Sequence, residues 1–407
     1  MFWAGKLKIR PMATKSPWVW RNEAWPAFSY DAPAVAGALA DAYRTHGIIE
    51  GKAAAIGLSP ASELSLEAMT AEVIATAAIE GERLPMDAVR SSVMRRLGLA
   101  ASGPADRSVD GLVAVIGDAT STVDVPLTAD QLCRWQSALF PGGTSGIRRI
   151  VVGRYRDHED PMQIVSGYPG REVVHYEAPP SRDVPGHMDQ FIMWFNASAP
   201  DSPTAVEGQP RLDGLARAAI AHLWFETIHP FEDGNGRIGR AIVDRAVAQH
   251  LEAPIRLYSL SRQLQTSRNA YYAALNAGQR GSLDATSWVL WFVGQCTAAY
   301  AAANRVIDQA LEKQRFWERE ASSVDINDRQ RKVLQRLLDA GDGGFEGGLN
   351  VEKYMKITGA PKTTATRDLS ALVSGGQLRT QGVGKALRYF IDVPGWKHGL
   401  LVQPPLV

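Results

Sequence analysis

Residues 229–240 read HPFEDGNGRIGR and place one histidine, two acids, three glycines and two arginines within twelve positions. The preceding residues, LDGLARAAIAHLWFETI (212–228), are mostly apolar and predict a buried helix. Because proline disfavours the α conformation in the residue before it, that helix is expected to break at His229. A second helix is expected over 237–252. The segment therefore predicts a loop between two helices, anchored in the core by Phe231.

The loop and the start of the second helix have the chemistry of an anion site. Glycine turns and helix N-termini present backbone N–H groups and partial positive charge to an anion. Arg237 and Arg240 lie on one face of the first turn, and arginine binds phosphate oxygens bidentately. Glu232 and Asp233 are candidates to hold Mg²⁺ against those phosphates. The alternative is a plain turn in which Asp233 caps the helix and the arginines are solvated.

The composition is that of a globular protein without a dominant charge. Of 407 residues, 45% are hydrophobic and 21% charged, and the formal net charge is +1, so a nucleic-acid or membrane partner would need a local patch. Cys133 and Cys296 fit neither a disulfide framework nor a metal motif, which favours a reducing compartment. No apolar run approaches the ~20 residues that span a bilayer, and no signal peptide is evident. A cytoplasmic protein is expected.

The pattern upstream of the loop is mainly helical. The large rings of Trp18, Trp20, Trp25 and Phe28 are expected to pack on the main body or on another subunit. The runs RRIVVGRY and REVVHYEAP, within 148–179, are β-branched and predict a hairpin. Thr128 is a plausible N-cap. Helical spacing or capping predicts helices over 34–49, 64–79, 127–141, 185–197, 212–228, 237–252, 261–277 and 284–312, and the stretch 101–126 is polar and then helical.

The C-terminal part predicts a separate domain. The charged residues 315–328 indicate a linker, and helices are expected over 328–340, 350–358 and 362–375, followed by strand, turn and strand. Three helices and a two-stranded wing predict a winged helix. Its small basic excess leaves DNA binding and protein docking both open. The candidate contact residues are Lys362, Thr363, Thr364, Thr366, Arg367, Arg379, Lys385 and Arg388.

The segment 229–240 resembles the Fic family, because it matches the signature HPFx[DE]GNGRxxR at every defined position. The hairpin, the helix leading into His229, the pair Tyr271 and Tyr272, the aromatic N-terminal segment and the C-terminal winged helix are also similar to a bacterial Fic subfamily. The resemblance implies a mainly α fold: a Fic-type helical bundle with a small β-hairpin flap, plus a C-terminal winged helix-turn-helix domain. The expected boundaries are 1–100, 101–315 and 324–393.

The resemblance implies transfer of AMP from ATP to a Ser, Thr or Tyr hydroxyl of a protein, including the chain itself, with release of pyrophosphate. His229 would be the general base and Asp233 would bind Mg²⁺ between the α- and β-phosphates. Gly234 and Arg237 are the residues that adenylylating members keep. Arg240 would receive the γ-phosphate. The expected ATP-binding residues are Phe231, Gly234, Asn235, Gly236, Arg237, Arg240 and, around the adenine, Tyr271, Tyr272 and Gln279.

The stretch TAAIEGE (76–82) resembles the inhibitory signature of the same family, [ST]xxxE[GN], through Thr76, Glu80 and Gly81. In that family the glutamate pairs with the second arginine of the motif, here Arg240. Arg240 cannot face both a carboxylate and a γ-phosphate, so an autoinhibited enzyme is expected. The same glutamate would also suit AMP removal. The alternative is a solvated glutamate at a helix end.

Weaker patterns leave other hypotheses open. His222, Glu226 and His229 have a spacing that metal ligands use, but core packing of His222 is the favoured interpretation. Residues 163–175, with His175, are expected to bind the target protein. Rival functions are a nucleotide-sensing, DNA-binding transcriptional regulator and a toxin with a built-in inhibitor. The expected partners are ATP, target proteins, a second copy of the chain and, through the winged helix, DNA; no membrane partner is expected.

Overall fold

The computed structural model describes residues 18–56, 58–100, 103–166, 171, 173–200, 202, 211–251, 256–321, 326–341, 344–345 and 347–396. The chain divides into two compact units, one up to Ala303 and one from Asn304. Both are mainly helical, as the sequence predicts. In the described residues, no helix is both long enough and apolar enough to cross a membrane.

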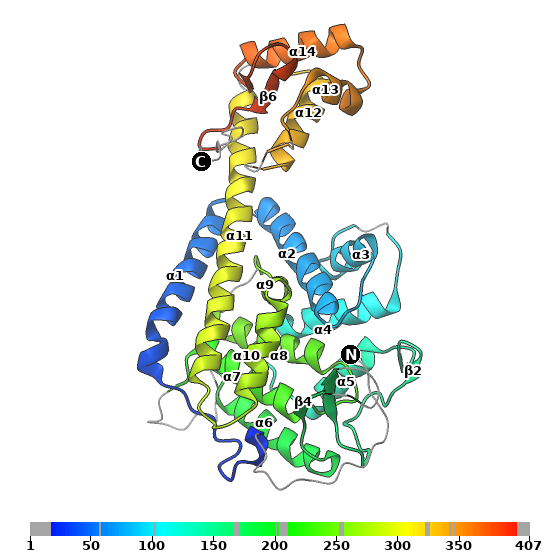
Figure 1. Cartoon of the computed structure of the whole chain (residues 1–407), viewed down its shortest axis with the longest axis vertical. Helices are drawn as coiled ribbons and strands as arrows, with labels where there is room; N and C mark the ends of the chain where they lie inside the picture. The colour runs from blue at the N-terminus through cyan, green and yellow to red at the C-terminus, as the bar shows by residue number, and fades with distance from the viewer. Residues whose placement is uncertain are drawn as a thin grey trace. The chain divides into compact units, whose positions relative to one another are not determined.

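The first unit is built around a buried helical pair. Helix α7 is mostly apolar, has no polar face and is buried along its whole length, because a helix without a polar face has to lie inside the protein. It packs against α8, and the two lie side by side in green in Figure 1. The helices are α1 (Ala32–Ile56), α2 (Leu58–Ile79), α3 (Met86–Arg96), α4 (Arg107–Ser121), α5 (Ala129–Leu139), α6 (Val184–Ala197), α7 (Gly214–Ile228), α8 (Asn235–Leu251), α9 (Leu260–Thr266), α10 (Arg268–Gly278) and α11 (Thr286–Ala321).

Most helices follow the sequence prediction, but α1 continues to Ile56 and α2 begins at Leu58, beyond the expected 34–49 and 64–79. Four further differences occur. Helix α3 was not expected. The helix expected over 261–277 is two helices, α9 and α10, which meet at Ser267. Helix α11 continues to Ala321, so the linker expected from residue 315 starts as helix. Helix α8 begins at Asn235, two positions before the expected start.

The strands correct the expected hairpin. Among the described residues of the first unit, β1 (Thr144–Ser145) pairs with β2 (Arg148–Arg149), and β3 (Gln163–Ser166) pairs with β4 (Val173–Glu177), all antiparallel. The pairing of 148–155 with 171–179 is wrong. The backbone groups of 150–151 are used elsewhere: Ile150 N donates to Gly143 O at 3.1 Å, and Val151 O accepts from Gln136 at 3.2 Å. Residues 167–170 and 172 of the expected target-binding segment lie outside the described residues.

The N-terminal aromatic segment packs on the body of the first unit, which confirms one of its two expected locations. Trp18 stacks edge-on against Tyr176 at 5.2 Å, and Trp25 stacks edge-on against Trp224 of α7 at 6.1 Å between ring centroids. Phe28 contacts the same Trp224 ring. The segment therefore covers the outer side of the helix that ends at His229.

The second unit has its own core. Helices α12 (Asp328–Asp339), α13 (Val351–Thr358) and α14 (Lys362–Ser374) precede the antiparallel strands β5 (Leu378–Gln381) and β6 (Arg388–Ile391). Leu337, Leu369 and Ile391 are among the buried residues they share. A capping box between Asn327 and Gln330 starts α12. The observed order of elements is the one that the sequence predicts.

Candidate active site

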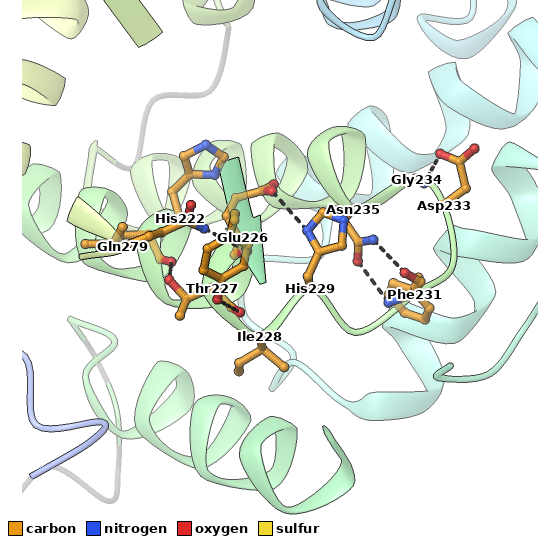
Figure 2. A network of polar contacts seen from close by, with 12 residues as sticks. His222, Glu226, Thr227, Ile228, His229, Phe231, Asp233, Gly234, Asn235 and Gln279 are labelled. Carbon is orange, nitrogen blue, oxygen red and sulfur yellow. Dashed lines mark hydrogen bonds and ion pairs between the residues drawn. The ribbon is translucent and has the colours of Figure 1, made fainter. Parts of the chain in front are cut away.

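His229 lies at the break that the sequence predicts. It ends α7 in the left-handed conformation, with φ 52° and ψ 60°, and it is the only non-glycine residue with positive φ among those described. A β-carbon makes this conformation costly, so the surrounding contacts must hold it. Only 13% of its side chain is exposed. Figure 2 shows the ring between the end of α7 and the loop that leads to α8.

Arg156 supplies many of the contacts that stabilise this backbone conformation, and sequence reasoning missed it. Its guanidinium donates to His229 O at 2.8 Å and Ile228 O at 3.2 Å, which are carbonyls left free at the end of α7. It also donates to Pro179 O at 2.6 Å and Ser181 Oγ at 2.9 Å. The side chain is 2% exposed, and desolvation by burial lowers the pKa of Arg156 to about 10. A buried arginine therefore caps the helix that leads into the 229–240 loop.

Hydrogen bonds across the loop make it rigid. Asn235 accepts from Phe231 N at 2.9 Å and donates to Phe231 O at 2.7 Å. Phe231 is fully buried, which confirms it as the anchor. Gly234 has φ 89°, and a β-carbon there would lie 3.0 Å from the Phe140 ring. Asn235 and Phe231 thus shape the loop, and both side chains are buried.

Arg240 is engaged by the end of α2. Its Nε donates to Thr76 Oγ1 at 2.6 Å, and its Nη2 donates to Thr76 O and to Glu80 Oε1, both at 2.9 Å. The Arg240 side chain is 4% exposed and that of Glu80 is 25% exposed, so this is a largely buried ion pair. Glycine at 81, with φ 85°, turns the chain away directly after Glu80. Thr76 and Glu80 therefore meet Arg240, as the sequence predicts.

A second carboxylate from the same segment meets the other arginine. Arg237 Nη1 bonds Glu82 Oε2 at 3.0 Å, and its guanidinium lies over the Phe140 ring at 4.8 Å. Sequence reasoning missed Glu82, because the inhibitory signature ends one residue before it. Its side chain is 41% exposed, so this bond is weaker than that of Glu80. Glu80 and Glu82 thus form ion pairs with both arginines of the motif.

Glu80 also lies against the first turn of α8. A β-carbon on Gly236 would stand 2.2 Å from Glu80 Oε1, so only glycine leaves room for an anion here. The carboxylate therefore occupies the position that helix geometry offers to a bound anion. The anion-binding interpretation of the loop is supported by a carboxylate of the chain itself.

The two acids of the loop have different surroundings. Glu232 accepts from Val151 N at 3.2 Å and lies 3.5 Å from Arg148, so it ties the loop to the segment after β2. The Asp233 side chain is 40% exposed and accepts from Gly234 N at 2.6 Å and from Ser145. One accessible carboxylate fits Mg²⁺, which binds one or two protein carboxylates together with substrate phosphates and water. No group of three or more potential ligands occurs in the part of the chain that the structure describes.

The residues expected around the adenine are largely internal. Tyr271 is 2% exposed, and its hydroxyl lies 2.7 Å from His222 Nε2. Gln279 donates to Glu226 O at 3.1 Å and is 3% exposed. Tyr272 donates to Ile79 O at 3.2 Å, at the end of α2. His222 is fully buried, which confirms that it packs in the core, and this burial lowers its pKa to about 3.

Two family models match this chain. The one described as Fic/DOC family matches residues 126–246, which include α7, the loop and α8. The one described as a domain of unknown function (DUF4172) matches residues 18–99, which include the aromatic segment, α1 and α2. The 229–240 segment and the segment that carries Glu80 therefore fall into separately described regions.

The chain is also similar to individual proteins. It is 25% identical over 138 residues to a probable protein adenylyltransferase of Aquifex aeolicus, a stretch that covers 33% of this chain and 37% of the relative. It is 20% identical to a Fic family protein from Desulfovibrio desulfuricans, covering 89% and 97% of the two chains with a TM-score of 0.47. Fic-1 from C. elegans is 20% identical over 70% of this chain and 76% of its own, also with a TM-score of 0.47. Residues 126–246 are therefore the part of this chain that is similar to the Fic/DOC family.

Proposed function

We propose that this protein is a Mg²⁺-dependent protein adenylyltransferase, restrained by its own Glu80. The observation that carries the proposal is the carboxylate of Glu80 over the first turn of α8, paired with Arg240 at 2.9 Å. A site that already holds the Glu80 carboxylate beside a buried imidazole suits the phosphates of a nucleoside triphosphate. The intact pattern from Gly234 to Arg240 supports transfer of AMP rather than of another group.

His229 would act as the base. Its Nδ1 faces Glu226 at 3.8 Å, so Nε2 is the nitrogen available to a target hydroxyl. As Nε2 takes the proton, the hydroxyl oxygen bonds the α-phosphorus, the bond from that phosphorus to the β-bridging oxygen breaks, and pyrophosphate leaves. Arg237, Arg240 and the α8 N-terminus would bind the polyphosphate, and Mg²⁺ held by Asp233 would neutralise its charge. In-line placement supplies most of the remaining rate.

Inhibition follows from competition for the same groups. A γ-phosphate that approaches Arg240 has to displace Glu80, and a phosphate that approaches Arg237 has to displace Glu82. Because the Arg240 pair is largely buried, its loss without replacement would cost about 2–3 kcal/mol. ATP in the resting protein would therefore bind weakly or out of line. Tyr272 supports this state through its bond to Ile79 O.

We propose further that residues 324–393 form the expected winged helix and dock a macromolecule. The order of α12, α13, α14, β5 and β6 supports this assignment. Lys362, Thr363 and Arg367 of α14 are exposed, whereas Asp368 is buried and bonded to Tyr354 at 2.9 Å. No specific observation among the described residues favours DNA over protein as the partner. The transcriptional-regulator hypothesis therefore stays secondary.

The test is a comparison of two labels. The purified Glu80→Gly chain would be incubated with Mg²⁺ and ATP labelled at either the α- or the γ-phosphate. We expect label on the protein from α-labelled ATP only, and a mass increase equal to one adenylyl group on a Ser, Thr or Tyr. Chelation of Mg²⁺ should abolish it. Label from the γ-phosphate, or from neither, would contradict the proposal.

A further inference from the structure

A buried carboxyl group and a buried imidazole face each other beside the 229–240 motif. Glu226 lies one turn before His229 on α7, and its Oε2 is 3.8 Å from His229 Nδ1. The Glu226 side chain is 6% exposed. Neither Glu226 Oε1 nor His229 Nδ1 has a hydrogen-bond partner among the described residues. Each of the two groups thus keeps one unpaired buried polar atom, which is costly and calls for a functional explanation. Figure 2 draws the contact as a dashed line.

The neighbouring helix leaves room for this carboxyl group. A β-carbon on Gly239 of α8 would lie 2.4 Å from Glu226 Oε1 and 3.2 Å from the His222 ring. Position 239 is undefined in the signature HPFx[DE]GNGRxxR, so the motif itself does not explain a glycine there. The first turns of α8 therefore accommodate the Glu226 carboxyl as closely as they accommodate Glu80 at Gly236.

The surroundings keep both groups uncharged near neutral pH. Burial, with the charge of Glu80 adding to it, raises the pKa of Glu226 to about 8. Burial also lowers the pKa of His229 to about 4. A neutral imidazole carries its single proton on one nitrogen, and the partner of that nitrogen decides which one. The carboxyl oxygen of Glu226 is an acceptor whether or not the group is ionised.

We propose that Glu226 is a positioning residue for His229: its Oε2 accepts the Nδ1–H and leaves the lone pair of Nε2 toward the phosphate site. This inference rests on the proposed function, in which Nε2 takes the hydroxyl proton. The present 3.8 Å exceeds a hydrogen bond, so a shift of about 1 Å has to close the contact. When Nε2 takes the hydroxyl proton, the Nδ1–H stays bonded to the Glu226 oxygen, and this bond stabilises the imidazolium without a further proton transfer.

Nuclear magnetic resonance tests the tautomer without ATP or target. The ring ¹⁵N signals of His229 would be identified by their loss in His229→Asn. We expect the Nδ1–H form in the wild-type chain and in Glu226→Gln, which keeps an acceptor oxygen, and the Nε2–H form in Glu226→Met, which has none. An Nε2–H form in the wild type, or no change in Glu226→Met, would overturn the proposal. Because no turnover is involved, this outcome is independent of the proposed function.

Kinetics in the Glu80→Gly background give the second readout. We expect Glu226→Met to lower kcat for α-label transfer by about a hundredfold with little change in KM for ATP, and Glu226→Gln to lose much less. Thr227→Val is the matched control, because it removes a neighbouring buried hydroxyl that bonds only Leu223 O of its own helix. If Glu226→Met and Glu226→Gln have the same activity, Glu226 acts through packing alone. The same conclusion follows if Thr227→Val loses as much activity as Glu226→Met. Thermal unfolding of each variant identifies any loss caused by misfolding.

Discussion

Replacing Glu80 by glycine is expected to raise self-labelling from ATP by about ten- to a hundredfold, because a largely buried charged pair opposes binding of the γ-phosphate. The variant removes the carboxylate that bonds Arg240 at 2.9 Å and clears the space above Gly236. Arg240 remains held by Thr76 and is ready for phosphate. Label transfer from α-labelled ATP and a direct titration of ATP affinity would measure the two parts of the effect.

Glu82 offers the matched comparison for Glu80. Its bond to Arg237 is more exposed to solvent, so Glu82→Gln should raise labelling only a few-fold, by about 0.5–1 kcal/mol of released interaction. The double variant should exceed either single one. If Glu80→Gly labels no faster than the wild type while its ATP affinity is unchanged, the account of inhibition is wrong. If Glu82→Gln raises labelling as much as Glu80→Gly does, the Glu82–Arg237 contact is not the weaker of the two, as the account requires.

Replacing His229 in the Glu80→Gly background is expected to reduce labelling by about a hundredfold or more, the contribution typical of a general base. Asparagine is the preferred substitute, because it tolerates the left-handed backbone observed at φ 52° better than alanine does. ATP affinity should stay within a few-fold of the parent, since Arg237 and Arg240 are untouched. Unchanged labelling in His229→Asn would remove the imidazole from the mechanism.

The pH profile of the same labelling carries an independent expectation. Burial lowers the pKa of His229 to about 4, so the imidazole is neutral and able to act as a base at pH 7. The rate due to this group should persist as the pH is lowered and be lost only as the pH falls through about 4. An unperturbed histidine would lose it near ~6.5. Labelling measured across this range in the Glu80→Gly variant distinguishes the two, because removal of Glu80 lowers the His229 pKa further.

The loop could be predicted from the sequence because its determinants are local. Pro230 forces the break at His229, Gly234 allows the positive φ, and the apolar run before them predicts a buried α7. The contact between Glu80 and Arg240 joins residues 160 positions apart and came only from the resemblance. Spacing alone gave no reason to pair them.

The residues that the sequence did not single out act over long separations. Arg156 caps α7 from 73 positions away, and nothing in its neighbourhood marks it as buried. Glu82 and Gly239 lie next to motif positions but outside the defined ones. The hairpin was assigned wrongly for a similar reason. The backbone groups of 150–151 bond to α5 and to a loop, and β-branched composition does not reveal such partners.

The most direct test of the central claim is a crystal structure of the Glu80→Gly variant with Mg²⁺ and an ATP analogue that resists cleavage between the α- and β-phosphates. We expect the polyphosphate over the first turn of α8, with the γ-phosphate on Arg240, the metal on Asp233 and the α-phosphorus facing His229 Nε2. A nucleotide bound elsewhere, or an empty loop at saturating analogue with Arg240 still turned toward Thr76, would contradict the account.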